Sequence, residues 1–266
     1  MKPFVFLLMI AAILGANYYV ILRLWQMTPG GPVARTAVTL CVAVALASML
    51  LSILAGGAFP SWMTSWMYRV GTAWFFVFLY LLMGLLLLDL ARLLRLFPDG
   101  WLRGNGLVLG ALALTVCVVM VWGYVRYRDK ARVELTVPVS GALPAGRPLT
   151  IVAVSDLHLG YGIGSKEFDG WVDRINAEKP DLVLIGGDAI DNSLRPLREQ
   201  RMEEGFRRIR SAYGVYAVPG NHEYIAGIDA SVAFLGEAGV RVLRDSVALV
   251  GGELYLVGRD DRTNAG

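Results

Sequence analysis

The fold is decided by three stretches in the C-terminal half, IVAVSDLH at 151–158, LVLIGGDAID at 182–191 and VYAVPGNHE at 215–223. Each stretch starts with a short aliphatic or β-branched run and then turns polar or glycine-rich. Such bounded apolar runs are typical of buried strands. Because segments with helical spacing lie between them, we expect an α/β domain in which strands alternate with helices.

Outward from these stretches, the same reading covers the rest of the C-terminal half. We expect strands near 149–154, 181–185, 215–218, 240–243, 246–250 and 254–257. We expect helices near 168–175, 197–209 and 231–237. The soluble domain is therefore expected at 149–266.

Polar side chains follow each of the first three expected strands. They are Asp156 and His158, then Asp188 and Asp191, then Asn221, His222 and Glu223. The carboxyl ends of parallel strands meet at one edge of a sheet, so we expect these side chains to converge there. Each short pattern alone also fits a chance pairing or a turn. All three on successive strand ends, with both histidines of the chain, indicate a metal site.

These motifs resemble the first three motifs of the calcineurin-like metallophosphoesterases, and they do so in the same order. The resemblance covers residues 149–266 and is greatest to membrane-anchored bacterial phosphoesterases. It implies that the domain is part of an α/β/β/α sandwich and follows N-terminal helices; the uncharged runs described below predict a transmembrane region of four helices.

The resemblance also implies a centre with two divalent cations of Mn, Fe or Zn. Asp156 and His158 would bind the first cation, Asp188 would bridge both, and Asn221 would bind the second. A mixed nitrogen and oxygen ligand set suits these metals better than calcium. Two such cations polarise phosphoryl oxygens and activate a water molecule.

Two further residues are implied to be catalytic. His222 would face the substrate phosphate, and the carboxylate of Asp191 would orient its ring. The implied reaction is hydrolysis of a phosphomonoester, phosphodiester or pyrophosphate bond.

The sequence departs from the family pattern after the third motif. The pattern continues with a lone histidine and a Gly-His-x-His motif, but no histidine follows His222 here. We therefore expect a C-terminally truncated member that holds one cation or none tightly. The alternative is an inactive or fragmentary membrane protein whose phosphoesterase-like domain binds a metal or a partner. A transporter or scaffold would need polar pairs inside the apolar runs, and the sequence shows none.

Composition divides the chain into two different halves. Hydrophobic residues make up 56% and charged residues 18%, and the mean hydropathy of +0.53 is too high for a soluble globular protein. Residues 1–132 have a net charge of +8 and residues 133–266 one of −5. The overall +3 is therefore no sign of a nucleic-acid partner. We expect a transmembrane anchor at 1–132 and a linker at 133–148.

Four uncharged runs in the anchor reach the roughly 20 residues that a helix needs to cross a bilayer. We expect spans near 4–22, 37–58, 70–88 and 107–125. The first run also fits a signal peptide, although three further runs make that unnecessary. Lysines and arginines divide almost evenly between the two sides, so the orientation stays open. We expect a multi-pass protein of the cell membrane, with the bilayer and a phosphorylated substrate, lipid-linked or not, as partners.

Two other features narrow the classes of protein. Cys41 and Cys117 both lie within apolar runs, which excludes a disulfide framework and a cysteine-ligated zinc site. Residues 193–210 contain six arginines and three glutamates. This pattern fits a solvated helix face with i,i+4 ion pairs, and less well a patch for anionic headgroups.

Overall fold

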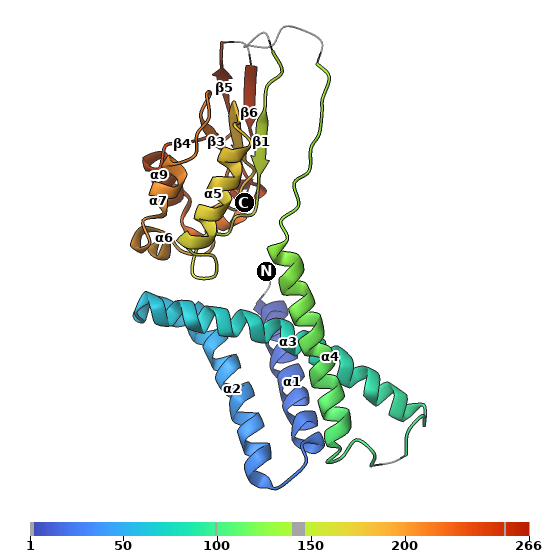
Figure 1. Ribbon diagram of the computed structural model, residues 1–266. Helices are drawn as coiled ribbons and strands as arrows, with labels where there is room; N and C mark the ends of the chain where they lie inside the picture. The colour runs from blue at the N-terminus through green and yellow to red at the C-terminus, as the bar shows by residue number, and fades with distance from the viewer. Residues whose placement is uncertain (1–2, 99, 140–146, 253, 266) are drawn as a thin grey trace. The chain divides into compact units, whose positions relative to one another are not determined.

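The computed structural model describes residues 3–98, 100–139, 147–252 and 254–265 of the chain (Figure 1). It divides into two compact units, Met1–Leu135 and Thr136–Gly266. The middle of the expected linker, residues 140–146, lies outside the described residues.

Long helices make up the described part of the first unit. They are α1 (Pro3–Met27), α2 (Pro32–Ala55), α3 (Ser61–Leu93) and α4 (Gly106–Arg128), with a 3-10 turn, η1 (Gly56–Ala58), after α2. Prolines begin α2 and precede α3, where a missing backbone N–H leaves no helical bond unmade. Asn105 caps α4 by accepting hydrogen bonds from the backbone N–H groups of Leu107 and Val108.

Three segments among the described residues are long and apolar enough to cross a membrane: Pro32–Ala58, Ser61–Leu93 and Gly106–Arg128. They contain the expected spans at 37–58, 70–88 and 107–125. The expected span at 4–22 lies inside α1, which is not among the three, so the count of four spans is not confirmed. Helix α3 starts well before residue 70, because the charge of Arg69 does not interrupt backbone hydrogen bonding.

All four helices of the first unit contribute to one apolar core. Its buried residues are Val20, Leu24 and Met27 of α1, Val42 of α2, Leu81 and Leu85 of α3, and Val116 of α4. The residues from α1 recur at helical spacing, so one face of α1 packs on the other three helices.

The second unit is built on a four-stranded parallel sheet in the order β1-β2-β3-β4. Its strands are β1 (Ile151–Val154), β2 (Leu182–Ile185), β3 (Val215–Ala217) and β4 (Val240–Val242). The register pairs Val154 with Ile185, and Ile185 with Ala217, so the first three strands end level with one another. An antiparallel hairpin of β5 (Ser246–Val250) and β6 (Leu254–Gly258) follows.

Helices connect and follow the strands of this sheet. They are α5 (Ser165–Ala177), α6 (Arg195–Glu199), α7 (Met202–Arg207), α8 (Asn221–Ala226) and α9 (Ile228–Glu237), followed by a 3-10 turn, η2 (Arg262–Ala265). The single helix expected at 197–209 is wrong. Arg201 adopts φ 53°, a left-handed conformation that ends α6 and starts a new helix at Met202.

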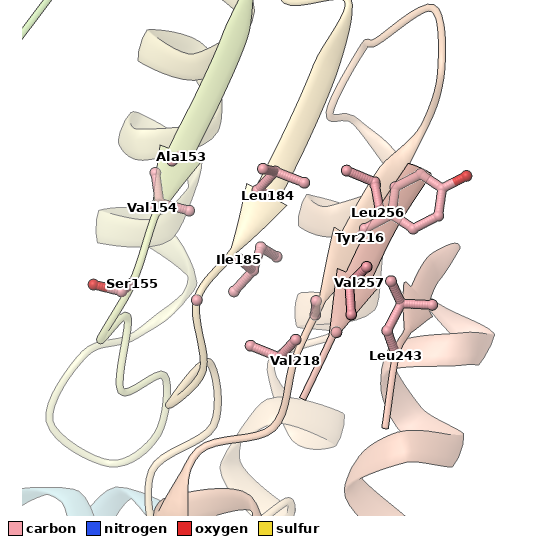
Figure 2. Close-up of a pocket in the computed structure, with 13 residues that line it drawn as sticks. Ala153, Val154, Ser155, Leu184, Ile185, Tyr216, Val218, Leu243, Leu256 and Val257 are labelled. Carbon is pink, nitrogen blue, oxygen red and sulfur yellow. The ribbon is translucent and has the colours of Figure 1, made fainter. Parts of the chain in front are cut away.

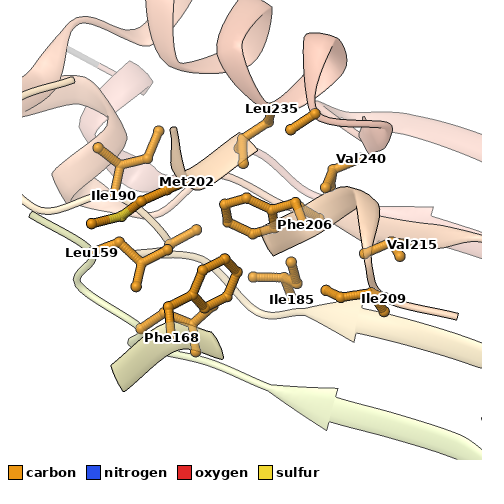
Figure 3. Packing of buried hydrophobic residues seen from close by; sticks show 14 of the residues in the cluster. Leu159, Phe168, Ile185, Ile190, Met202, Phe206, Ile209, Val215, Leu235 and Val240 are labelled. Atoms are coloured by element: carbon orange, nitrogen blue, oxygen red, sulfur yellow. The ribbon is translucent and has the colours of Figure 1, made fainter. Parts of the chain in front are cut away.

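Helices cover one face of the sheet, and the main hydrophobic core lies between these helices and that face (Figure 3). Alternate strand residues, Val183, Ile185, Val215, Ala217 and Val240, belong to this core. The helices contribute Phe168, Val172 and Ile175 of α5, Leu197 of α6, Met202 and Phe206 of α7, and Phe234 of α9. Alternation of this kind places every second strand residue on the helical face.

The opposite face of the sheet lines a cavity of about 430 Å³ together with strand β6 (Figure 2). Ala153, Leu184 and Tyr216 reach it from the sheet, and Leu256 and Val257 from the hairpin. An α/β domain with a parallel sheet is therefore confirmed. The α/β/β/α sandwich implied by the resemblance stays a prediction.

Candidate metal centre

The polar residues singled out in the sequence follow the carboxyl ends of β1, β2 and β3. Ser155 and Asp156 follow β1, Gly186 to Asp188 follow β2, and Asn221 begins α8 after β3. Because the three strands are parallel and end level, their polar residues lie at one edge of the sheet. The apolar cavity reaches this edge at Ser155, Gly186 and Val218, so it lies beside the polar cluster.

The backbone at this edge is strained. Asp156, His158 and Asp188 have φ values of 55°, 44° and 50°, in the left-handed region that non-glycine residues rarely adopt. Strain of this kind persists only where surrounding contacts impose it, and it concentrates at functional sites. Gly187, with φ 94°, precedes Asp188. A Cβ atom at Gly187 would lie 3.1 Å from the backbone of Gly220, so a glycine lets the two loops approach closely here.

Backbone hydrogen bonds join the loop after β1 to the loop after β2. The N–H of Asp156 donates to the carbonyl of Gly187 at 3.2 Å, and the N–H of His158 donates to that of Asp188 at 2.8 Å. These bonds continue the pairing of β1 with β2 past the strand ends. They fix the side chains of Asp156, His158 and Asp188 relative to one another.

His158 lies between carboxylates. Its Nε2 is 3.9 Å from Asp156 Oδ1 and 3.9 Å from Asp188 Oδ2, and its Nδ1 is 3.8 Å from Asp191 Oδ1. Ligand atoms that each lie about 2.1 Å from one cation are at most about 4.2 Å apart. Each of these two carboxylate oxygens therefore lies close enough to Nε2 to share a cation with it.

His222 faces the same cluster from α8. Its Nδ1 is 3.2 Å from Asp191 Oδ1, which also accepts a hydrogen bond from Asn192 Nδ2 at 3.0 Å. The ring of His222 meets that of His158 edge to face, with centroids 4.4 Å apart. Nδ1 is buried, and its alignment with Asp191 falls short of hydrogen-bond geometry. The carboxylate of Asp191 thus lies beside His222, and the implied role of Asp191 in orienting the ring stays a prediction.

The expected ligands come from the loops after β1 and β2 and from the start of α8. His158 lies near both Asp156 and Asp188, and Asn221 occupies the exposed first position of α8. Ligand atoms of His158, Asp188 and His222 lie within 4.8 Å of one another. His222 is thus placed either to act on a substrate or to bind a cation.

The donor set and charge of the cluster fit a divalent cation. Three carboxylates, from Asp156, Asp188 and Asp191, lie within 3.9 Å of His158. Like charges this close repel one another, and a cation among them relieves the repulsion. Imidazole and carboxylate ligands together suit Mn, Fe or Zn.

Glu223 belongs to the third motif, although neither the residue pattern nor the resemblance assigned it a role. The structure buries its carboxylate, which accepts a hydrogen bond from the N–H of Gly220 at 2.7 Å. A glutamate three residues after the residue that caps a helix is half of a capping box, and that spacing could have indicated this contact.

Comparison with known proteins shows which family the sequence of the second unit matches. Residues 149–260 match the family of calcineurin-like phosphoesterases. An uncharacterized metallophosphoesterase of Aquifex aeolicus is 34% identical over 49% of this chain and 49% of that protein. A transmembrane protein with metallophosphoesterase domain from Bos taurus is 36% identical, over 42% of this chain and 26% of that protein.

A further relative, an uncharacterized metallophosphoesterase of Helicobacter pylori, is 31% identical over 40% of this chain and 28% of that protein. The chain thus spans about half the length of the Aquifex relative and about a quarter of the other two. No solved structure matches.

Proposed function

We propose that this chain, which carries a calcineurin-like phosphoesterase domain at residues 149–260, is a membrane-anchored, metal-dependent phosphoesterase. It would hydrolyse a phosphomonoester, phosphodiester or pyrophosphate bond. The observation that carries the proposal is the convergence of His158 with Asp156 and Asp188 at 3.9 Å, beside His222 and Asp191.

Asp156, His158 and Asp188 would hold the first cation, and Asp188 with Asn221 would hold the second. Bound cations of this kind polarise phosphoryl oxygens and lower the pKa of water to near neutrality. The chain's own contribution is to place several carboxylates and an imidazole around one point at the end of the sheet.

His222 and Asp191 would carry out proton transfer with the substrate. With a proton on Nδ1 directed at Asp191 Oδ1, the other ring nitrogen, Nε2, is left to exchange a proton with substrate. Which nitrogen of a histidine carries the proton is fixed by the partner of the other, and here that partner is a carboxylate. Asp191 itself is buried, so it keeps its position while the ring of His222 acts.

The first unit supports the membrane part of the proposal. Three of its helices could cross a bilayer, and the Bos taurus relative is named a transmembrane protein. We propose the cell membrane as the location and the lipid bilayer and a phosphorylated substrate as partners. A lipid-linked phosphate would satisfy both, and no feature calls for a specific nucleic-acid partner.

Metal content and turnover of the full chain in mild detergent test the proposal. We expect one tightly held cation among Mn, Fe and Zn by mass spectrometry, because the first position has three ligands and the second has two, one of them shared. Hydrolysis of a generic phosphodiester should be negligible without added Mn²⁺ and should rise with it. A chain that keeps its cation but gains no activity with Mn²⁺ would support the alternative, an inactive metal-binding domain.

The variant His222→Ala separates a catalytic role from a ligand role. A general acid or base typically contributes 10²–10⁴-fold to rate. We expect kcat to fall by a factor in this range, about 10²–10⁴, while metal content stays close to that of the wild type. His158→Ala is the matched control and should lose the metal. Metal loss in His222→Ala would instead make His222 a ligand, as its position near His158 and Asp188 permits.

A further inference from the structure

Glu223 is a buried carboxylate directly behind the candidate metal centre. It follows His222 in α8, and the residue is only 1% exposed. Burying a carboxylate is costly unless hydrogen bonds replace the water it loses. The groups that donate these hydrogen bonds show which parts of the chain the Glu223 carboxylate connects.

The carboxylate of Glu223 accepts three backbone hydrogen bonds from two different loops. Its Oε2 accepts from the N–H of Asp188 at 3.0 Å and from that of Gly220 at 2.7 Å. Its Oε1 accepts from the N–H of Ile190 at 2.9 Å. Asp188 and Ile190 belong to the loop after β2, and Gly220 to the loop after β3. One side chain therefore fastens together the two loops that carry most of the centre.

A further hydrogen bond joins the same parts of the chain, but in this one α8 donates and the loop after β2 accepts. The backbone N–H of His222 donates to Asp188 Oδ1 at 3.0 Å. This bond fixes Oδ1 and leaves Oδ2, which lies 3.9 Å from His158 Nε2, directed into the centre. A side chain at Gly220 would collide with the Asp188 carboxylate, so the contact is as close as the two loops allow.

The backbone conformation of Asp188 also depends on surrounding contacts. It has φ 50° and follows Gly187 at φ 94°, so its loop leaves β2 through two consecutive left-handed residues. Conformations of this kind persist only where surrounding contacts determine them. Glu223 binds the N–H of this residue, and thereby sets where its carboxylate lies.

We propose that Glu223 is a positioning residue that fixes Asp188 relative to His222 and so sets the affinity of the centre for its cation. The inference rests on the proposed function in one respect, namely that the centre binds a divalent cation. Both carboxylate oxygens of Glu223 accept hydrogen bonds from backbone N–H groups, so Glu223 acts on the cation through Asp188.

The geometry makes specific demands on the side chain. Both carboxylate oxygens accept hydrogen bonds, so Glu223→Gln must place an NH₂ group against at least one backbone N–H. Glu223→Asp keeps the charge but is one methylene shorter, so it cannot reach both loops. The two variants therefore disturb the same contacts by different means.

A matched control lies at the other end of β2. Asp181 is also a buried carboxylate, and it accepts hydrogen bonds from the N–H of Thr150 at 2.9 Å and from Arg147. Asp181→Asn should weaken the same unit while leaving the carboxyl ends of the strands intact. It separates a general loss of stability from a change at the centre.

The first measurement is a titration in which Mn²⁺ is added to the metal-free full chain in detergent. Electron paramagnetic resonance measures how much Mn²⁺ is bound. Changes to groups that support metal ligands typically cost 10–100-fold in metal affinity. We expect about a 10–100-fold weaker affinity in Glu223→Gln and Glu223→Asp, and no change in Asp181→Asn. Wild-type affinity in both Glu223 variants would overturn the inference.

The second measurement, amide hydrogen exchange without metal, does not depend on the proposed function. We expect the amides of Asp188, Ile190 and Gly220 to exchange faster in Glu223→Gln than in the wild type, and Asp181→Asn to leave them protected. Unchanged exchange at these amides would overturn the inference. A wild-type chain that binds no Mn²⁺ would overturn the proposed function, and the exchange result would then decide the inference alone.

Discussion

At the scale of single residues, the left-handed backbone of Asp156, His158 and Asp188 is the main evidence for a preformed site. Each such residue costs of order 1–3 kcal/mol. Two of them, Asp156 and His158, donate backbone hydrogen bonds to the loop after β2, so the cost is met by pairing between loops. The ligand side chains are thus held close together by the fold itself.

Asp181 supports the opposite end of the same strand. Its carboxylate accepts a hydrogen bond from Arg147 Nη2 at 2.6 Å and from Nη1 at 3.0 Å, and the two oxygens of the carboxylate take one each. The hydrogen bond from Arg147, and then that from the N–H of Thr150, lower the pKa of Asp181 below its ordinary value. The pair fastens the chain just before β1 to the start of β2.

This lowered pKa predicts how the stability of the second unit depends on pH. A carboxyl whose pKa is lower in the folded state stabilises the fold above its unfolded pKa of about 3.9, and the effect disappears as pH falls through the folded value. We expect Asp181→Asn to be less stable than the wild type at pH 7, with the difference shrinking below about pH 4. Thermal unfolding from pH 7 to pH 3 measures this, and a difference that grows as pH falls would contradict it.

The convergence of Asp156, His158 and Asp188 could be predicted from sequence because parallel strands that end level bring their following residues to one edge. The role of Glu223 could not. Two of its three partners, the N–H groups of Asp188 and Ile190, lie 35 and 33 residues away in the chain. Only tertiary structure brings such distant backbone groups to one carboxylate.

At the scale of helices, the ion pairs around α6 and α7 show what the arginines of residues 193–210 contact. Arg195 pairs with Glu199 at 2.8 Å, Arg198 with Glu237 at 3.2 Å, and Arg208 with Asp169 at 2.8 Å. These partners lie on α5 and α9 as well as on α6 itself. The pairs favour a solvated, ion-paired surface over a patch for anionic headgroups. Local spacing predicted one helix here, because the left-handed Arg201 leaves no trace in the pattern of apolar residues.

Helices α2 and α3 meet at a glycine. A Cβ atom at Gly71 would lie 2.5 Å from Cα of Met49, so the two backbones are in direct contact. Helices in membranes associate through small residues that allow this approach. Gly110, in α4, has open space where its Cβ would be.

The same substitution at these two glycines should therefore have opposite effects. Gly71→Ala must push α2 and α3 apart, and overpacking of this kind typically costs about 1–3 kcal/mol. Gly110→Ala adds only the higher helix propensity of alanine and should be neutral or stabilising. Thermal unfolding of both variants in detergent measures the difference. Equal behaviour of the two variants would show that α2 and α3 do not touch at Gly71.

At the scale of the whole molecule, a helical unit and an α/β unit follow one another in a single chain. Their net charges of +8 and −5, counted over residues 1–132 and 133–266, reflect different surroundings. Basic residues at the end of α4, Arg126 and Arg128, lie where a helix leaves the apolar part of the chain. Positive residues flanking a span favour contact with anionic lipid.

The role of α1 decides the topology of the helical unit. Tyr19 and Arg23 of α1 donate hydrogen bonds to Asp89 Oδ2 of α3 at 2.7 Å and 2.9 Å. The residues around Asp89 in the sequence do not predict a partner on α1. Ionised residues inside membrane bundles usually face the bundle interior and pair with one another. This pair joins the C-terminal ends of α1 and α3.

We predict that α1 crosses the membrane together with α2, α3 and α4, although it is not among the three segments selected by length and composition. The N–H of Gly104 donates to the carbonyl of Gln26 at 2.9 Å, so the last turn of α1 lies against the loop before α4. Reporter fusions after Lys2 and after Pro148 should then report the same compartment, and a fusion after Gly104 the opposite one. If the Gly104 and Pro148 fusions differ but Lys2 sides with Gly104, α1 does not cross, and the chain has three spans.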